Sequence, residues 1–189
     1  MAGYNDWTND TIQTYRDGLK WGAKMKRGIW LDFKDFNPNL VEKALAMAGE
    51  AGIPHSRIIV GTWSQPALAY LNKHHPDIRR VAHTYVRPKE QGYATNLAKG
   101  RTFANEDELL AALLEAKERL GLYGLNMPSG SVRSKKRGVI YDTPPGFVKR
   151  LQDNGLWVSM WFVHNADIGA RWRSEGANAF VTNCKANTK

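Results

Sequence analysis

The sequence has little of what a secreted, disulfide-bonded or membrane-spanning protein needs. Its single cysteine, Cys184, excludes an internal disulfide and a zinc site made of several cysteines. No apolar run approaches the roughly 20 residues of a membrane-spanning helix. The polar start MAGYNDWTND also lacks the basic and apolar regions of a secretory signal. We therefore expect a cytoplasmic or peripheral membrane protein.

Glycine-rich phosphate loops and acidic residues are also scarce. No such loop follows a predicted strand, which argues against a dinucleotide-binding fold. The chain has 27 Lys and Arg against 18 Asp and Glu, a net charge of +9. This excess favours anionic partners, although a solvated loop is the simplest explanation of each basic cluster, at 24–27, 79–89 and 133–137. Nucleic acid is not expected, because basic and aromatic residues do not interleave on one element.

The stretch 28–35 carries the clearest pattern. It alternates aromatic and β-branched residues with others, which predicts a β-strand. Side chains on a strand alternate between faces, so one face is apolar and the other carries Asp32 and Lys34 near the carboxyl end. Charge inside a sheet is costly unless it is paired, binds a metal or opens to water. The alternative is an Asp–Lys pair on a solvated strand face.

Strands and helices alternate about six times over a single domain, 1–189. We predict further strands at 57–63, 80–86, 122–127, 157–163 and 179–182. We predict helices at 8–25, from Pro38 to Gly49 or Gly52, and at 64–75, 105–120, 143–154 and 165–175. The stretches 87–101 and 129–138 are predicted loops, and no hairpin signal is seen. The pattern indicates a parallel sheet covered by helices, either doubly wound or curled into a barrel.

Three stretches carry a resemblance to a known family: WLDFK at 30–34, RIIVGTWSQPALAYLNKHHPDI at 57–78 and VSMWFVHNADIGARWRSEGANAFVTN at 158–183. In order and spacing they resemble the glycerophosphodiester phosphodiesterase superfamily of phospholipase-C-like barrels. The aspartate followed by lysine resembles fungal-type phosphatidylglycerol phospholipases and sphingomyelinase-D-like enzymes in particular. The resemblance implies a TIM-type (β/α) barrel, which needs eight units and typically about 250 residues. We therefore expect an incomplete barrel of about six units, units three to eight.

The departures from the family pattern are equally informative. The family carries a His-Arg-Gly stretch on its first strand, and two acidic metal ligands with a second histidine on its second. Nothing in residues 1–27 resembles either. His164 stands where the family usually has Asn, and Asn178 where Asp is common. We expect the open barrel to be completed by dimerisation or by a missing N-terminal segment, because exposed strand edges associate.

The resemblance assigns roles to four residues. It implies that Asp32 binds a divalent cation, Mg²⁺ or Ca²⁺, and that Lys34 contacts the substrate phosphate. Trp161 is expected from the resemblance to form an apolar wall for a glycerol or lipid headgroup, although packing alone would also explain it. Asn126 ends a strand and is a candidate to hydrogen-bond the substrate, although a turn role would explain it equally well. A lone carboxylate should hold a hard ion poorly, since such ions take several oxygen ligands.

None of the five histidines fits a catalytic pair. His55 precedes a strand, and His74 and His75 close a helix, where a cation favours the dipole. His83 lies in a strand and is expected to be a satisfied interior residue. His164 ends a strand on the correct face and is the remaining catalytic candidate.

Two functions follow as expectations. One is metal-dependent hydrolysis of a glycerophosphodiester or phospholipid headgroup, which the chain alone need not retain. The other is a non-catalytic barrel that binds an anionic membrane or another polyanion through the basic stretches 87–101 and 133–137.

Overall fold

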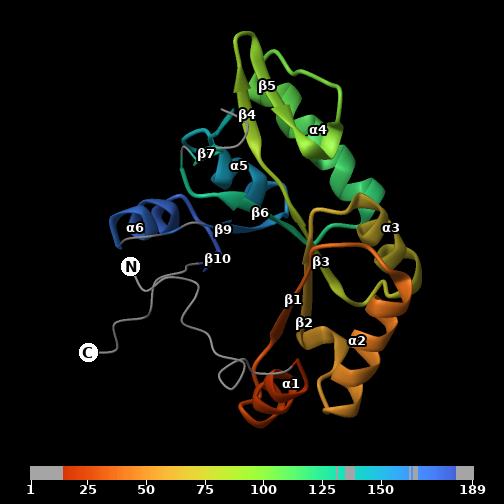
Figure 1. Cartoon of the computed structure of the whole chain (residues 1–189). Coiled ribbons are helices and arrows are strands. Elements are labelled where there is room, and N and C mark those ends of the chain that lie inside the picture. The colour runs from red at the N-terminus through yellow and green to blue at the C-terminus, as the bar shows by residue number, and fades with distance from the viewer. Residues whose placement is uncertain (1–14, 131, 135–138, 162, 164–165, 182–189) are drawn as a thin grey trace.

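The computed structural model describes residues 15–130, 132–134, 139–161, 163 and 166–181. Its centre is one parallel six-stranded sheet that curls into part of a barrel (Figure 1). The strands, in spatial order, are β1 (Ile29–Phe33), β2 (Ile58–Thr62), β3 (Arg79–His83), β6 (Gly124–Pro128), β9 (Trp157–Trp161) and β10 (Ala179–Val181). Chain order and spatial order agree, as they do in a (β/α) barrel and not in a doubly wound sheet. The prediction of an incomplete TIM-type barrel is confirmed.

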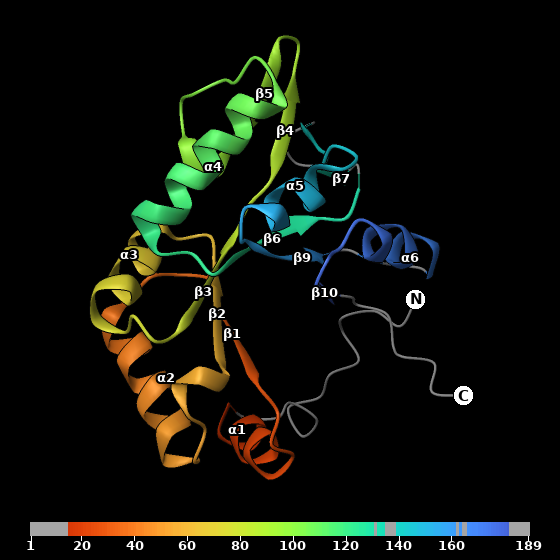
Figure 2. The same cartoon turned by 180° about the vertical axis from the view of Figure 1, so that it is seen from behind.

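Helices cover the outer side of the sheet, as Figures 1 and 2 show from opposite directions. They are α1 (Tyr15–Lys24), α2 (Pro38–Glu50), α3 (Gln65–His74), α4 (Glu106–Leu120), α5 (Phe147–Asp153) and α6 (Ala166–Ser174). Two short 3₁₀ turns, η2 (His55–Arg57) and η3 (Asn96–Ala98), complete the helical elements of the described residues. None of the described helices has the length and apolar character needed to cross a membrane.

Local sequence signals explain where these helices begin and end. The Asn37 side chain accepts hydrogen bonds from the second and third N–H groups of α2, and Pro38 occupies the first position. Asn105 accepts from the Glu108 N–H at 3.0 Å, and the Glu108 carboxylate accepts from the Ala104 N–H at 2.9 Å. This is close to the reciprocal capping arrangement that the sequence predicts. Gly121 ends α4 in the left-handed region, with φ +58°.

The core lies between the sheet and the helices in two clusters. One contains Leu31 and Phe33 of β1, packed with side chains of α1 and α2. The other lies under α4, α5 and α6 and includes the fully buried Trp172. The apolar face predicted for the first strand is therefore the outer, helix-covered face. Its opposite face, with Asp32 and Lys34, lines the inside of the curl.

Two β-hairpins lie within or at the border of stretches for which the sequence predicts loops, 87–101 and 129–138. The first joins β4 (Val86–Lys89) to β5 (Gly92–Thr95), and the second joins β7 (Val132–Ser134) to β8 (Val139–Tyr141). A side chain at Gly92, where φ is +100°, would lie 1.9 Å from the Phe103 carbonyl oxygen. The expectation of a loop over 87–101 without hairpins is thus wrong. These strands are short and carry proline and charged residues, so no alternation of polarity is visible.

Both hairpins follow strands that end at the same edge of the sheet. The first comes directly after β3, where the Asn96 amide donates to the His83 carbonyl at 3.0 Å and accepts from Thr84 Oγ1 at 2.8 Å. The second follows β6, and the Asp142 N–H donates to the Val86 carbonyl at 3.0 Å. The hairpins therefore stand next to each other beside the carboxyl ends of the strands.

Candidate functional site

Asp32 lies on the inner face of the curled sheet, near the carboxyl end of β1. Its backbone is in register with Gly61 of β2. One carboxylate oxygen, Oδ2, forms an ion pair with the Lys34 ammonium on the same strand face. The side chain of Lys34 is 70% exposed and that of Asp32 is 37% exposed. The prediction that these two side chains share one face is confirmed, and they form the partly exposed Asp–Lys pair that the sequence analysis gave as the alternative.

His83 joins this pair from the other side of β2. Its Nε2 lies 3.2 Å from Asp32 Oδ1, although β1 and β3 are not neighbours. Gly61 on β2 carries no side chain that would separate them, and a Cβ there would lie 2.7 Å from the Trp30 indole nitrogen. The glycine thus leaves the space in which the indole of Trp30 and the contact between Asp32 and His83 are accommodated.

Asn126 and Ser159 extend the contact across two more strands. The Asn126 amide nitrogen donates to His83 Nδ1 at 2.8 Å, and Ser159 Oγ donates to the Asn126 amide oxygen at 2.8 Å. All three side chains are buried, with exposed fractions of 6% for His83, 4% for Asn126 and none for Ser159. Buried polar groups that all find partners form a well-defined network.

His83 is a buried imidazole inside this network. Burial lowers its pKa below the ordinary histidine value, while the Asp32 carboxylate acts in the opposite direction. Both ring nitrogens are engaged, one with Asp32 and one with Asn126. The expectation of a satisfied interior residue is confirmed. His83 is not placed to exchange a proton with a ligand in this arrangement.

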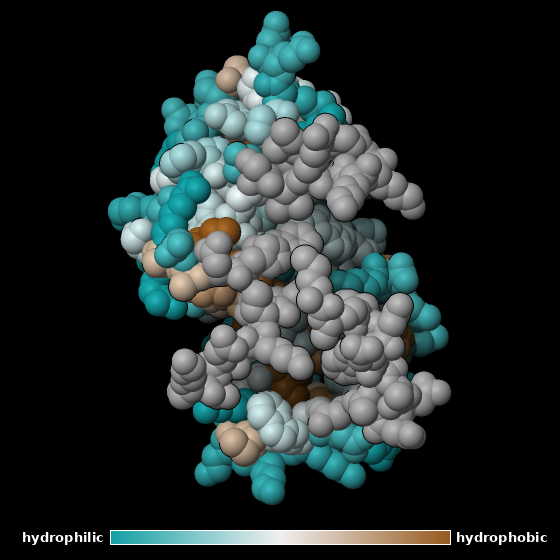
Figure 3. Space-filling model, turned by 60° about the vertical axis from the view of Figure 1, so that its left-hand side comes forward, coloured by the Kyte–Doolittle hydropathy of each residue, from teal (hydrophilic) through white to brown (hydrophobic). Residues whose placement is uncertain are grey.

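Aromatic side chains wall the same face. Trp63, directly after β2, lies 5.4 Å from the His83 ring and 6.2 Å from the Trp161 ring, between centroids. Trp161 therefore stands beside the network, and Trp63 adds a wall residue that the sequence prediction omitted. Deeper in the curl, Trp30 packs against Trp157 with centroids 6.0 Å apart. On the face shown in Figure 3, hydrophobic residues are visible within a hollow of the surface.

The donors at Asp32 do not make up a Mg²⁺ or Ca²⁺ site by themselves. Among the described residues, no group of three or more His, Cys, Asp or Glu side chains is arranged to hold a metal ion. Asp32 is a single carboxylate, and its two oxygens already face the Lys34 ammonium and His83 Nε2. Hard divalent ions take six or more oxygen ligands. Metal binding at Asp32 would need further ligands from outside these residues.

The other histidines lie away from this network or outside the described part of the chain. His164, the catalytic candidate, falls outside the described residues. His55 pairs with Asp77 at 2.8 Å, and His75 pairs with Glu42 at 2.7 Å. Both lie beside the amino ends of β2 and β3, as predicted.

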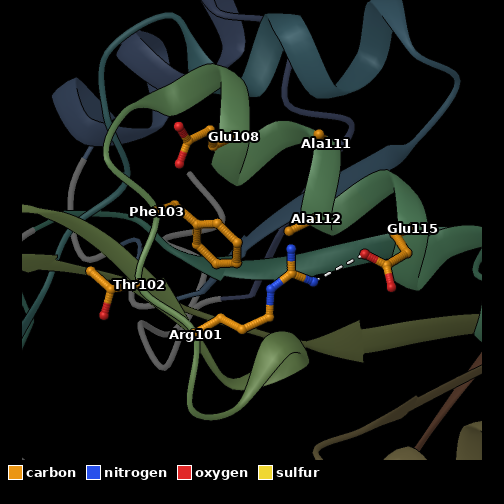
Figure 4. A pocket seen from close by; sticks show the side chains of 7 residues that line it. All are labelled: Arg101, Thr102, Phe103, Glu108, Ala111, Ala112 and Glu115. Atoms are coloured by element: carbon orange, nitrogen blue, oxygen red, sulfur yellow. Dashed lines mark hydrogen bonds and ion pairs between the residues drawn. The ribbon is translucent and has the colours of Figure 1, made fainter.

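A groove lies elsewhere on the molecule, between α4 and the segment that follows β5 (Figure 4). Its volume is about 400 Å³. In it Arg101 already pairs with Glu115 at 3.1 Å, and Phe103 forms part of the floor. None of the residues that line it belongs to the Asp32 network. The groove therefore adds no chemical group to the candidate site.

Sequence reasoning identified Asp32, Lys34, Trp161 and Asn126 but left out His83 as a member of the same site. The signal available was register: parallel strands place the ends of β3 and β6 side by side, with His83 opposite Asn126. The contact between Asp32 and His83 across β2 depends on Gly61. The role of this glycine becomes visible only when the spatial order of the strands is known.

No protein-family model matches this sequence, and a search of curated proteins finds no match. Solved structures do match. One is a phosphodiesterase from Oleispira antarctica in complex with the product sn-glycerol-3-phosphate, with 14% identity, TM-score 0.57, and coverage of 88% of this chain and 56% of that one. Another is a glycerophosphodiester phosphodiesterase from Parabacteroides distasonis, with 13% identity, TM-score 0.58, and coverage of 88% and 58%. This chain has the fold of the matching part of these phosphodiesterases.

The shared fold confirms the resemblance found in the sequence, at the level of architecture. This chain spans 56 to 58% of the length of these two phosphodiesterases. What it has in common with them is therefore the fold of a set of β/α units.

Proposed function

We propose that this chain is a phosphoric diester hydrolase of the glycerophosphodiester type, which binds the phosphate of a glycerophosphodiester or phospholipid headgroup at Lys34. The observation that supports it is the Asp32–Lys34 pair on the inner face of this fold, beside an aromatic wall. The similar phosphodiesterase from Oleispira antarctica holds sn-glycerol-3-phosphate, which has the chemistry this pair would receive.

Each described side chain would make a separate contribution to hydrolysis. Lys34 would neutralise charge on the phosphoryl oxygens, where charge develops in the transition state. Trp63 and Trp161 would pack against the glycerol or headgroup carbons and exclude water. Asn126 would act on the substrate indirectly, because its amide is occupied by His83 and Ser159. His164 would be the candidate proton donor to the leaving alkoxide.

A divalent ion is part of the proposal only as an additional component. When bound, it would stabilise charge on the phosphoryl group. Asp32 would supply one oxygen ligand, and the described residues supply no complete set. We therefore assign no catalytic step to the ion.

The test is release of sn-glycerol-3-phosphate from glycerophosphoethanolamine, measured with and without added Mg²⁺ or Ca²⁺. We expect turnover that Asp32→Asn abolishes and that the matched control Asp153→Asn leaves unchanged, since Asp153 is exposed on α5 and pairs with Lys149. Absence of turnover with every ester and ion tried, in a folded protein, would contradict hydrolysis by this chain.

The second candidate function is binding without catalysis. It is favoured by the engagement of both His83 nitrogens and by the incomplete ligand set. The hairpin segment exposes Lys89, Lys99 and Arg101, which suit an anionic surface. Much of the second basic stretch, 133–137, lies outside the described residues. Salt-sensitive binding to vesicles that contain phosphatidylglycerol, without turnover, would favour this alternative.

A further inference from the structure

A single hydrogen-bonded chain crosses the inner face of the sheet from β9 to β1. It begins at Ser159 Oγ, passes through the Asn126 amide and the His83 imidazole, and ends at the Asp32 carboxylate. The successive distances are 2.8, 2.8 and 3.2 Å. Lys34 occupies the remaining Asp32 oxygen. The sequence gives no hint of this chain, because its members lie on four different strands.

The acceptor at one end determines the direction of every donor in the chain. An ionised carboxylate only accepts, so a neutral His83 must carry its proton on Nε2, which faces Asp32. Nδ1 is then an acceptor and requires a donor from Asn126. The amide must therefore turn its nitrogen to His83 and its oxygen to Ser159, whose hydroxyl donates. The reverse arrangement would bring the bare Nε2 lone pair against the carboxylate.

Packing holds the ring in this orientation. The His83 ring lies 5.4 Å from the ring of Trp63 and 6.2 Å from that of Trp30, between centroids. The ring is buried, and both of its nitrogens have partners, so rotation about its side-chain bonds would break two hydrogen bonds at once.

We propose that Asn126, anchored by Ser159, fixes His83 as its Nε2–H tautomer, and that His83 is thereby a positioning residue for the Asp32 carboxylate. His83 holds Oδ1, so that Oδ2 stays turned toward Lys34. The use of that pair for a phosphate ester rests on the proposed function. The tautomer and its dependence on Asn126 do not.

The direct test is long-range ¹H–¹⁵N correlation of the histidine rings in the full ¹⁵N-labelled chain, with His83 assigned from the signals lost in His83→Gln. At about pH 7 we expect His83 to show a protonated Nε2 and an unprotonated Nδ1. Asn126→Asp replaces the donor that faces Nδ1 by an acceptor, so Nδ1 of His83 should become protonated. The control Asn39→Asp adds the same charge at an exposed position of α2 and should leave His83 unchanged.

His55 provides an internal reference, since its Nδ1 faces Asp77 and it lies outside the network. Its signals should not respond to Asn126→Asp. The proposal is overturned if wild-type His83 carries its proton on Nδ1, if it averages between both tautomers, or if Asn126→Asp leaves its pattern unaltered.

A second measurement separates this proposal from the proposed function. With sn-glycerol-3-phosphate as the titrant, His83→Leu should weaken binding about fivefold, because the carboxylate loses its support. His83→Gln retains an N–H donor and should restore affinity to within about twofold. Equal losses in both variants would reject a positioning role. Absence of binding in the wild-type protein would reject phosphate recognition. The NMR experiment would still test, independently of binding, whether Asn126 fixes the tautomer of His83.

Discussion

Asp32 on β1 and His83 on β3 are joined at 3.2 Å across an intervening strand, and the residue between them is Gly61. Neighbouring strands in a sheet lie about 4.8 Å apart, so two long side chains can meet over β2 only if β2 leaves the space free. The absence of a side chain at Gly61 is therefore a structural requirement of the site.

Gly61→Ala should consequently destabilise the protein and separate Asp32 from His83. The new Cβ would lie 2.7 to 2.8 Å from three atoms of the Trp30 indole, which must move. We expect a loss of about 1–3 kcal/mol in the free energy of unfolding, measured by urea titration, with a shift in tryptophan fluorescence. In the control Gly18→Ala the new Cβ meets nothing within 4 Å on helix α1, so stability should rise by about 0.5–1 kcal/mol. An unchanged free energy of unfolding in Gly61→Ala would show that the packing around Trp30 tolerates a methyl group at this position.

Replacement of Lys34 by methionine should remove most of the affinity for sn-glycerol-3-phosphate while the fold remains intact. Lys34 is largely exposed, so its charge contributes little to stability but faces any anion bound beside Asp32. We expect at least a roughly tenfold loss of affinity by calorimetry, and a weaker dependence of binding on salt. Lys149→Met, which removes an equally exposed cation from α5, is the control. Similar losses in both variants would indicate only a general attraction to positive charge.

Divalent ions should bind weakly to the isolated chain. Asp32 offers one carboxylate already engaged by Lys34 and His83, and no described group of three acidic or imidazole ligands exists. Sites with few charged ligands bind Ca²⁺ with dissociation constants of about 10⁻³ M or weaker. Calorimetric titration of Mg²⁺ and Ca²⁺ into wild-type protein and Asp32→Asn checks this. Micromolar binding that Asp32→Asn abolishes would reveal additional ligands outside the described residues.

How far the sequence predicted this molecule depends on the range of the interactions. Local signals sufficed for the helix starts at Asn37, Ser64 and Asn105, because a cap acts within four residues. Alternation along one strand sufficed to place Asp32 and Lys34 on the inner face. The hairpin at 86–95 was missed, because its strands are short and polar. His83 was missed as a partner of Asp32, because that contact depends on strand order and on Gly61.

Stability should fall in acid through two carboxylates that pair with histidines, Glu42 with His75 and Asp77 with His55. Hydrogen bonds from His75 and Tyr70 lower the pKa of Glu42, and a hydrogen bond from His55 lowers the pKa of Asp77. A carboxyl group whose pKa is lower in the folded chain binds fewer protons when folded than when unfolded. Its contribution to stability is therefore complete above the unfolded-state pKa, and it is lost as the pH falls through the folded-state pKa. The unfolded-state pKa values are near 4.5 for Glu42 and 3.8 for Asp77.

In the variant Glu42→Gln the free energy of unfolding should therefore fall less steeply as the pH is lowered, so that the acid limb of the stability–pH curve is flatter. Both carboxylates are exposed, so the effect of each should be below about 1 kcal/mol. Urea unfolding measured from about pH 7 downward compares wild type, Glu42→Gln and the control Glu90→Gln, which changes an exposed residue in the first hairpin turn. An unchanged acid limb in Glu42→Gln would mean that the pairs with His75 and Tyr70 do not persist in solution.

The edges of the curled sheet should drive association. Within the described residues β1 pairs only with β2, and β10 only with β9, so each presents one open edge. Helix α1 beside β1 carries Trp21, which is 61% exposed, and β10 carries the exposed Val181. Open strand edges next to apolar side chains are a site for further chains to add. We expect dimers, or complexes with a complementary segment, whose sedimentation coefficient rises with protein concentration.

Trp21→Lys should shift that equilibrium toward the monomer, because it places a charge beside the open edge of β1. Leu40→Lys is the matched control, since Leu40 is similarly exposed but lies on α2, which connects the paired strands β1 and β2. Sedimentation velocity over a wide concentration range separates the two variants. The wild-type protein could instead stay monomeric at every concentration and unfold in one cooperative step. That result would mean that the described edges are already protected within the chain. It would contradict the expectation of a partner.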